Sequence, residues 1–265
     1  MAVQSPVQLT QTRFRLDLID GWGLKPGARV LEVGCGQGDM TAALADTVGA
    51  GGHVLGVDIA SPGYGAPVTL GQSAAHLAET PLGKRIEFRF ECDVLDPATS
   101  FPAAAFDDVV LSQCSWYFAG LGQLRQTLAR VRPWARRLCF AEWDLTARSP
   151  AQLPHLLAVL IQGQIEAGGS HGEGNVRTPF SRQVLLEILA ETGWQIDGQR
   201  TADTASLQDA DWEVDACLQL LDDHRRLSAL PSALADLVAS QGDLLHQIAR
   251  HHGNLPLPCY SVTAH

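Results

Sequence analysis

Three alternate glycines follow a short apolar stretch near residue 30, and they constrain the fold more than any other feature. The segment is Val30-Leu31-Glu32-Val33-Gly34-Cys35-Gly36-Gln37-Gly38-Asp39-Met40. Its apolar start predicts a buried strand, and the alanine-rich residues after it predict a helix. Glycines between a strand and a helix make a tight turn and let a ligand approach the backbone. Because open α/β sheets bind ligands at the carboxyl ends of their strands, this turn is the predicted ligand site.

Acidic residues around this turn narrow the class of ligand. Asp39 stands where a dinucleotide fingerprint needs its third glycine, and no lysine follows for a phosphate-binding loop. Glu32 is expected at the mouth of the turn, where a carboxylate suits a cationic ligand. Asp58 ends the next predicted strand and is expected to accept both hydroxyls of a ribose. Asp93 ends a third strand and is a candidate partner for the exocyclic amine of adenine.

A ligand with a ribose, an adenine and positive charge but no phosphate is S-adenosylmethionine. The same segments resemble the class I methyltransferases that use this cofactor, from about Gln8 to Asp144. The resemblance implies that the turn lines the cofactor with its backbone and that residues after two further strands contact the adenine and methionine ends. The cofactor-binding residues implied are Glu32, Gly34, Cys35, Gly36, Gly38, Asp58, Ile59, Asp93, Val94, Ser112 and Gln113.

The resemblance also implies the fold class, which is α/β. We expect a Rossmann-like seven-stranded sheet, mostly parallel with an antiparallel last strand, and an inserted helical cap. Methyltransferases of this class end in an antiparallel hairpin, which here would be split by about fifty mostly helical residues. The expected division is a cofactor-binding core at 1–148, a cap helix and loop at 149–180, a core helix and sixth strand at 181–202, a cap insertion at 203–255 and a last core strand at 256–265.

Aromatic side chains cluster after the fourth predicted strand, residues 106–111. Three consecutive aromatics, residues 116–118, cannot all face one core, because neighbours on a strand or helix point apart. At least one of them should line a pocket. A glycine-flanked tyrosine, a tryptophan ending the fifth strand and an arginine in the glycine-rich loop 168–179 are further candidates. The predicted substrate-binding residues are therefore Tyr64, Trp116, Tyr117, Trp143 and Arg177.

Three side chains are candidates for a general base, which helps methyl transfer where an oxygen or nitrogen must lose its proton. His224 falls at helical spacing with the leucines of the cap and is expected to face inward. His171 lies in the glycine-rich loop, and Glu142 ends the fifth strand, where it could instead bind a substrate amine. By contrast, His155 falls opposite the leucine-rich face of a predicted helix at 150–167 and is expected to be solvated.

Composition excludes some classes of partner. A formal net charge of −10 over 265 residues argues against nucleic acid, because phosphate backbones require clustered lysine and arginine. No apolar run approaches the ~20 residues of a membrane span, and the first residues do not resemble a signal peptide. The six cysteines form no Cys-x-x-Cys pair, so we expect reduced thiols, no metal site and a cytoplasmic location. A homodimer is left open.

The leading hypothesis is a methyltransferase that acts on a small molecule at oxygen, nitrogen or carbon, in specialised metabolism. Phenolic or indole-like acceptors would suit the aromatic candidates. One alternative is an enzyme that binds S-adenosylmethionine but catalyses a cyclisation or rearrangement. Others are a protein or RNA methyltransferase and a non-catalytic subunit.

Overall fold

Seven strands form one sheet in the computed structural model, which describes residues 5–171 and 176–265. The strands are β1 (Arg29–Val33), β2 (His53–Val57), β3 (Ile86–Arg89), β4 (Phe106–Ser112), β5 (Ala135–Trp143), β6 (Ile196–Ala202) and β7 (Cys259–Ala264). Their order is β3-β2-β1-β4-β5-β7-β6, and among them β7 alone runs antiparallel to its neighbours. The order reverses direction between β1 and β4, which places the glycine turn after β1 at the topological switch point.

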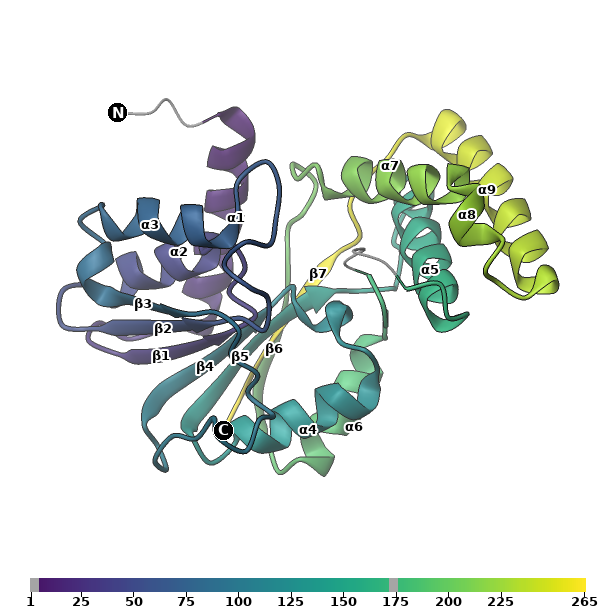
Figure 1. The fold of residues 1–265 in the computed structure, drawn as a ribbon. Helices are drawn as coiled ribbons and strands as arrows, with labels where there is room; N and C mark the ends of the chain where they lie inside the picture. Colours follow the sequence, from purple (N-terminus) through teal and green to yellow (C-terminus); the bar gives the residue numbers. More distant parts are fainter. Residues whose placement is uncertain (1–4, 172–175) are drawn as a thin grey trace.

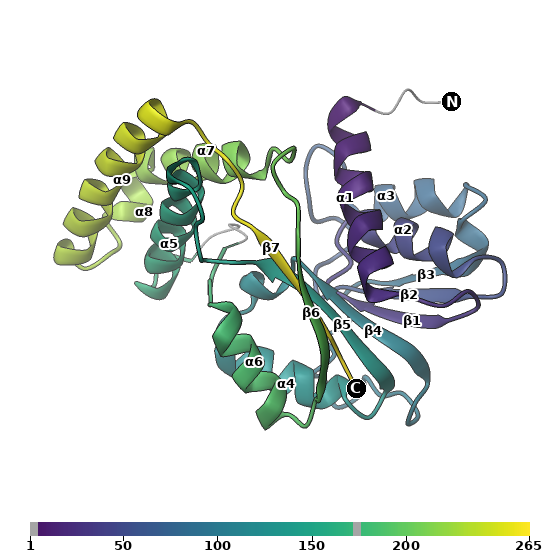
Figure 2. The ribbon, with the colours of Figure 1, turned by 180° about the vertical axis from the view of Figure 1, so that it is seen from behind.

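Helices cover both faces of this sheet (Figures 1 and 2). On one face lie α1 (Pro6–Trp22), α2 (Asp39–Val48) and α3 (Leu70–Ala78), and on the other lie α4 (Leu121–Val131) and α6 (Arg182–Glu191). Short 3-10 turns are η1 (Gly83–Arg85), η2 (Ser115–Tyr117) and η3 (Pro150–Gln152). Side-chain caps start several helices, as at α6, where the Ser181 hydroxyl accepts from the Val184 amide. Most residues of the central strands β1, β4 and β5 are buried between these layers.

A second group of helices forms the cap, which Figure 1 shows beyond one end of the sheet. Its members are α5 (Leu153–Ala167), α7 (Asp209–Asp222), α8 (His224–Leu227) and α9 (Ser232–His252). The cap has its own apolar cluster, formed by Ala158, Ile161, Ile165, Val214, Cys217, Leu230, Val238 and Leu245. Helix α5 also sends Val159 into the core of the sheet. Because α5 belongs to both cores, the cap is packed against the sheet rather than tethered to it.

The predicted fold class is confirmed, including the split hairpin. Strands β6 and β7 pair from Ile196 with Ala264 to Ala202 with Cys259, although α7, α8 and α9 lie between them in the sequence. No helix in the described part of the chain has the length and apolar character to cross a membrane.

Two local predictions in the cap are wrong. The helix predicted to run through His224 breaks at Asp223, whose carboxylate accepts from the next two backbone amides and starts α8. The buried face of α5 is also not the leucine face, because Leu153 and Leu160 are more than a third exposed whereas His155 is fully buried. This helix packs against the sheet as well as against two cap helices, so its buried arc is wider than one apolar stripe.

Candidate active site

The glycine turn after β1 needs its glycines for different reasons. All three have positive φ, at 76° for Gly34, 51° for Gly36 and 84° for Gly38. A Cβ on Gly34 would lie 2.7 Å from the Cβ of Cys114, and one on Gly38 would lie 2.7 Å from the ring of Phe88. A Cβ on Gly36 would meet nothing within 4 Å. The outer glycines are therefore required by packing, whereas Gly36 faces open space where a ligand could approach.

Asp58 fixes the shape of this turn from the end of β2. Its Oδ2 accepts from the Gly36 amide and its Oδ1 accepts from the Ala60 amide, both at 2.9 Å. A carboxylate has about four acceptor positions, so each oxygen retains a lone pair for a ligand. The next side chain, Ile59, is 63% exposed and presents apolar surface beside the turn. Asp58 and Ile59 therefore lie together where the ribose and adenine contacts were predicted.

Glu32 lies beneath the turn rather than at its mouth, which corrects the prediction. It is 3% exposed, and its Oε2 accepts from the Thr41 hydroxyl at 2.5 Å. Burial raises the pKa of Glu32 to about 8. Cys35 is buried as well, at 5% exposed. A contact between the Glu32 side chain and a ligand stays a prediction, and the geometry shows instead a hydrogen bond that joins β1 to α2, the helix after the turn.

The other predicted cofactor residues end β4 or follow β3. Asp93 accepts from the Leu95 amide with its Oδ1 at 2.8 Å, and Val94 is buried in the core. The hydroxyl of Ser112 is buried without a hydrogen-bond partner in residues 5–171 and 176–265. Gln113 has a φ of 51°, and its backbone N–H donates to the Ala141 carbonyl. This backbone turn directs the chain after β4 towards the cap.

A small enclosed pocket lies between the sheet and the cap. The sheet side supplies residues from the ends of β4 and β5 and from η2, and the cap side supplies residues from α5 and α7. Its lining comprises Gln113, Trp116, Tyr117, Glu142, Trp143, His155, Val159, Val176 and Glu213. The sequence analysis had selected the first five. It missed the last four, of which His155 had been expected in solvent.

The chain segment that borders the pocket, at Gln113 and Trp116, also contacts the glycine turn. Cys114, between Gln113 and η2, donates its thiol to the Val33 carbonyl at 3.2 Å. Its Cβ also fills the position that a Gly34 side chain would take. A molecule in the pocket would therefore lie close to a ligand on the turn.

Glu142 holds η2 in place at the edge of this pocket. Its Oε2 accepts from the amide and the hydroxyl of Ser115, at 3.1 and 2.6 Å, and its Oε1 accepts from its neighbour Trp143 at 3.1 Å. Burial raises the pKa of Glu142 to about 7. Since three of its about four acceptor positions are occupied, the geometry favours a positioning role over that of a base, and the predicted catalytic role is untested.

Glu213 faces the pocket from α7 with fewer bonds. Its Oε2 accepts from Nε2 of Gln162 at 2.9 Å, and burial raises the pKa of its carboxyl. This carboxylate is better placed to take a proton than Glu142. No motif in the sequence distinguishes Glu213 from the other acids of an acidic helix, because only the packing of α7 against α5 brings it here.

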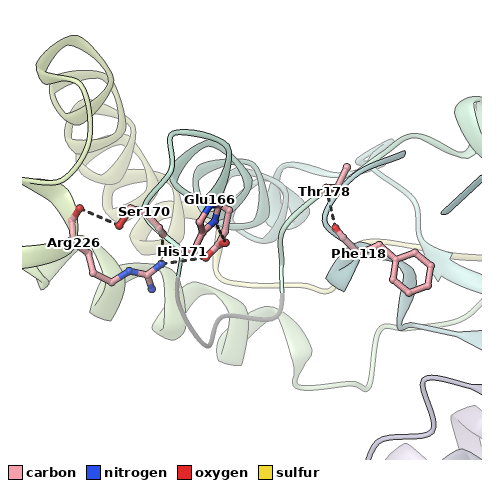
Figure 3. Close-up of polar contacts among 6 residues, drawn as sticks. All are labelled: Phe118, Glu166, Ser170, His171, Thr178 and Arg226. Carbon is pink, nitrogen blue, oxygen red and sulfur yellow. Dashed lines mark hydrogen bonds and ion pairs between the residues drawn. The ribbon is translucent and has the colours of Figure 1, made fainter. Parts of the chain in front are cut away.

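His171 lies apart from the pocket, at the carboxyl end of α5. Figure 3 shows its ring against Glu166, with Nδ1 3.2 Å from a carboxylate oxygen. Arg226 contacts the other oxygen of Glu166 and the carbonyl of Ser170. The side chain of His171 is 78% exposed. His171 therefore contacts the Glu166 and Arg226 pair and does not line the pocket.

Three further predicted site residues do not line the pocket. His224 is exposed at the first position of α8, so the prediction that it faces inward is wrong. Arg177 is exposed, and its backbone amide donates to the Trp116 carbonyl. Tyr64 is 44% exposed in the loop after β2. Residues 172–175 of the glycine-rich loop, between His171 and Arg177, lie outside the described residues.

A larger cavity at the opposite edge of the sheet does not compete as the active site. It is lined by Lys25, Pro26, Gly27, Ala28, Asp107, Asp108, Arg136 and Arg137. These residues lie near the amino ends of β1, β4 and β5, whereas ligands of open α/β sheets bind at the carboxyl ends. Its charges are also paired, as between Arg137 and Asp108 at 2.6 Å.

Comparison with known proteins identifies the family. A family model described as "Methyltransferase domain" matches residues 30–137. The chain is 31% identical over 211 residues to Methyltransferase phomM' of Diaporthe leptostromiformis, a match covering 65% of this chain and 54% of the relative. It is 40% identical over 119 residues to Nocamycin O-methyltransferase of Saccharothrix syringae, covering 45% of this chain and 38% of the relative. It therefore spans about half the length or less of these curated relatives.

Among solved structures, a cyclopropane-fatty-acyl-phospholipid synthase-like protein from Lactobacillus casei is similar over nearly the whole chain. The identity is 34%, the match covers 97% of this chain and 91% of that one, and the TM-score is 0.87. This chain belongs to the class I S-adenosylmethionine-dependent methyltransferases. S-adenosylmethionine, the cofactor of these enzymes, is therefore the ligand expected at the glycine turn.

The turn fits S-adenosylmethionine on three observations. Gly36 leaves open space at the backbone, Asp58 retains free lone pairs beside it, and Ile59 presents exposed apolar surface of the kind that an adenine ring covers. The buried Ser112 hydroxyl, unpartnered within the described segments, is a fourth group that a ligand at the end of β4 would satisfy. The individual roles of these residues stay predictions.

Proposed function

We propose that this protein transfers a methyl group from S-adenosylmethionine to a small molecule held in the pocket between sheet and cap. The main support is the position of that pocket, because Gln113 and Trp116 line it while Cys114, between them in the sequence, contacts the glycine turn. When bound, the cofactor supplies a methyl group on a positively charged sulfur, which a nucleophile displaces in line. The pocket is enclosed by helices α5 and α7, and this arrangement suits the exclusion of water from such a reaction.

The side chains of the pocket favour an aromatic acceptor. Trp116 and Trp143 are buried, and Tyr117 completes an aromatic wall. Flat aromatic ligands stack well on such side chains. Glu213 is the group that we assign to take the proton of the acceptor, because its carboxylate accepts one hydrogen bond from the described residues whereas that of Glu142 accepts three. The named relatives phomM' and Nocamycin O-methyltransferase support a role in specialised metabolism.

The test is to incubate the full chain with cofactor labelled in the methyl group and a panel of naphthols, naphthylamines and indoles, with RNA and a protein mixture as separate arms. We expect label in a small aromatic product and an equal amount of S-adenosylhomocysteine. Label confined to RNA or protein would contradict the proposal. Conversion of an acceptor without a gain of one methyl mass would point instead to cyclisation or rearrangement.

A further inference from the structure

His155 is the most unusual polar group in the pocket. It is the third residue of α5, it is fully buried, and its ring lines the pocket edge to face with Trp143, with ring centroids 5.2 Å apart. The sequence pattern predicted that this histidine is solvated, so its burial calls for a structural or functional explanation. Its two ring nitrogens have different surroundings, and this difference defines what the ring can do.

The backbone identifies the tautomer of His155. The amide of Leu257, just before β7, donates to Nδ1 at 3.0 Å. A backbone N–H can only donate, so Nδ1 carries a lone pair and the proton of the neutral ring is on Nε2. Burial lowers the pKa of His155 to about 4, so the ring is neutral near pH 7. The ring is therefore a hydrogen-bond donor at Nε2 and not a base.

That donor has no partner among the described residues. Nε2 of His155 is buried and unbonded, and the same holds for Nε1 of Trp116, which is also a donor only. An unsatisfied buried donor costs about 1–3 kcal/mol. Two such N–H groups on residues that line one pocket indicate a ligand atom that accepts hydrogen bonds.

The carboxyl groups nearby complete the chemical description. Glu142 accepts three hydrogen bonds, from Ser115 and Trp143, whereas Glu213, on the cap side, is bonded by Gln162 at one oxygen. A hydroxyl group matches this set, since it has a proton to give to the Glu213 carboxylate and an oxygen to accept from N–H groups. After that proton leaves, the oxygen has three lone pairs, so it can accept twice and still act as a nucleophile. An amine nitrogen has a single lone pair and cannot do both.

We propose that His155 and Trp116 bind the reacting oxygen of the acceptor through their ring N–H groups, so that the substrates are phenols or enols rather than amines. This inference rests on the proposed function and specifies its substrate class. His155 acts as a binding donor that stabilises negative charge on oxygen, in the manner of an oxyanion hole.

The first experiment needs no turnover. Nitrogen NMR of the histidine-labelled protein is expected to show His155 as the Nε2–H tautomer, without titration between about pH 5 and 8. Adding a naphthol in the presence of S-adenosylhomocysteine is expected to shift the Nε2–H resonance, whereas the matching naphthylamine should shift it much less. An Nδ1–H tautomer, or an Nε2–H signal that ignores the naphthol, would overturn the inference.

The second experiment separates binding from structure with matched variants. In His155→Asn the side-chain oxygen can still accept from the Leu257 amide, but the donor at the Nε2 position is lost. In His155→Gln the amide nitrogen can replace Nε2 as a donor, but the bond to Leu257 is lost. We expect naphthol methylation to fall about tenfold to a hundredfold in His155→Asn, measured well below the unfolding midpoint of the variant. That midpoint should fall as well, because the variant loses the ring that packs on Trp143. His155→Gln should retain more activity at lower stability.

Trp116→Phe removes the second donor while keeping an aromatic ring, and we expect a loss of similar size. Equal activity of wild type and His155→Asn, or a wild type that methylates the naphthylamine better than the naphthol, would refute the inference while leaving methyl transfer itself intact. If no probe is methylated, the proposed function fails, and the NMR response to the naphthol still decides whether His155 binds an oxygen.

Discussion

The two halves of the site are built in different ways. The cofactor half is mostly backbone, because one turn with Gly36 at its centre and one carboxylate, Asp58, set its shape within a few residues of β1 and β2. The half that we propose for the acceptor is made of side chains from distant parts of the chain, such as Trp116, His155 and Glu213. Local chain geometry therefore determines the first half, whereas the second depends on how the cap packs.

The largest loss of activity is expected from Glu213→Gln, a substitution in the acceptor half. If Glu213 takes the acceptor proton, kcat should fall by about 100-fold or more. Because burial raises its pKa above the ordinary 4.5, wild-type activity should rise with pH through a correspondingly higher value, and the variant should lose this acid limb. Steady-state kinetics across pH measure both.

The matched control is Asp215→Asn, an exposed carboxylate on the same helix, which should leave the rate unchanged. Cofactor affinity should be the same in both variants, since α7 contributes to the acceptor half. An unchanged pH profile in Glu213→Gln would assign the proton to another group.

A second pair of variants tests the backbone half. Gly34→Ala places a Cβ 2.7 Å from that of Cys114 at positive φ, so we expect the free energy of unfolding to fall by about 2–4 kcal/mol. Gly36→Ala meets no atom, so its cost should be about 1 kcal/mol, from backbone strain alone. Its main effect should be weaker cofactor binding, by about tenfold. Chemical denaturation and calorimetric titration measure the two effects, and an equal loss of stability in both would contradict the assignment of Gly36 to the ligand.

Asp58→Ala should weaken cofactor binding by about 1–3 kcal/mol through the loss of charge-assisted hydrogen bonds. Asp58→Asn is the matched control, because it keeps the size of the side chain and one acceptor for the Gly36 amide. We expect it to fall between the wild type and Asp58→Ala in a calorimetric titration. Unchanged affinity in Asp58→Ala would refute the ribose assignment.

The burial of Glu32 predicts that the stability of the fold depends on pH. The folded protein keeps this proton up to about pH 8, whereas the unfolded chain releases it near pH 4.5. The folded state thus binds more protons in this range, and the free energy of unfolding falls as pH rises, by at most about 1.4 kcal/mol per pH unit. Glu142 adds the same sign up to about pH 7. Thermal unfolding of Glu32→Gln should show a weaker slope than that of the wild type, and identical slopes would contradict this account.

The smallest effect is expected from His224→Ala, which tests the corrected position of this residue. Since His224 is exposed outside the pocket, stability should change by less than about 0.5 kcal/mol and the rate by less than about twofold. A large loss of activity would mean that the cap rearranges to bring His224 inward.

The sequence allowed the sheet, the split hairpin and the glycine turn to be predicted, because each depends on short apolar runs and on residues with special backbone freedom. It also located the aromatic segment after β4 and the acid that ends β5. It failed at His155 and His224, where a face had to be chosen from helical spacing. The face predicted for His155 was wrong because α5 packs on two cores. The face predicted for His224 was wrong because Asp223 interrupts the helix. The contribution of Glu213 depends on contacts between helices, about which spacing gives no information.

The attachment of the cap has a consequence for how such enzymes diversify. The long insertion that carries α7, α8 and α9 leaves the sheet after Ala202 and returns at Cys259, and these two residues are paired neighbours. A tight bend could join the same two points, so exchanging this insertion for another would break no ladder between β6 and β7. Recombination at this one pair of residues could then change the acceptor preference and leave the cofactor-binding strands unchanged. Only the contacts of α5 with the new insertion would have to form again.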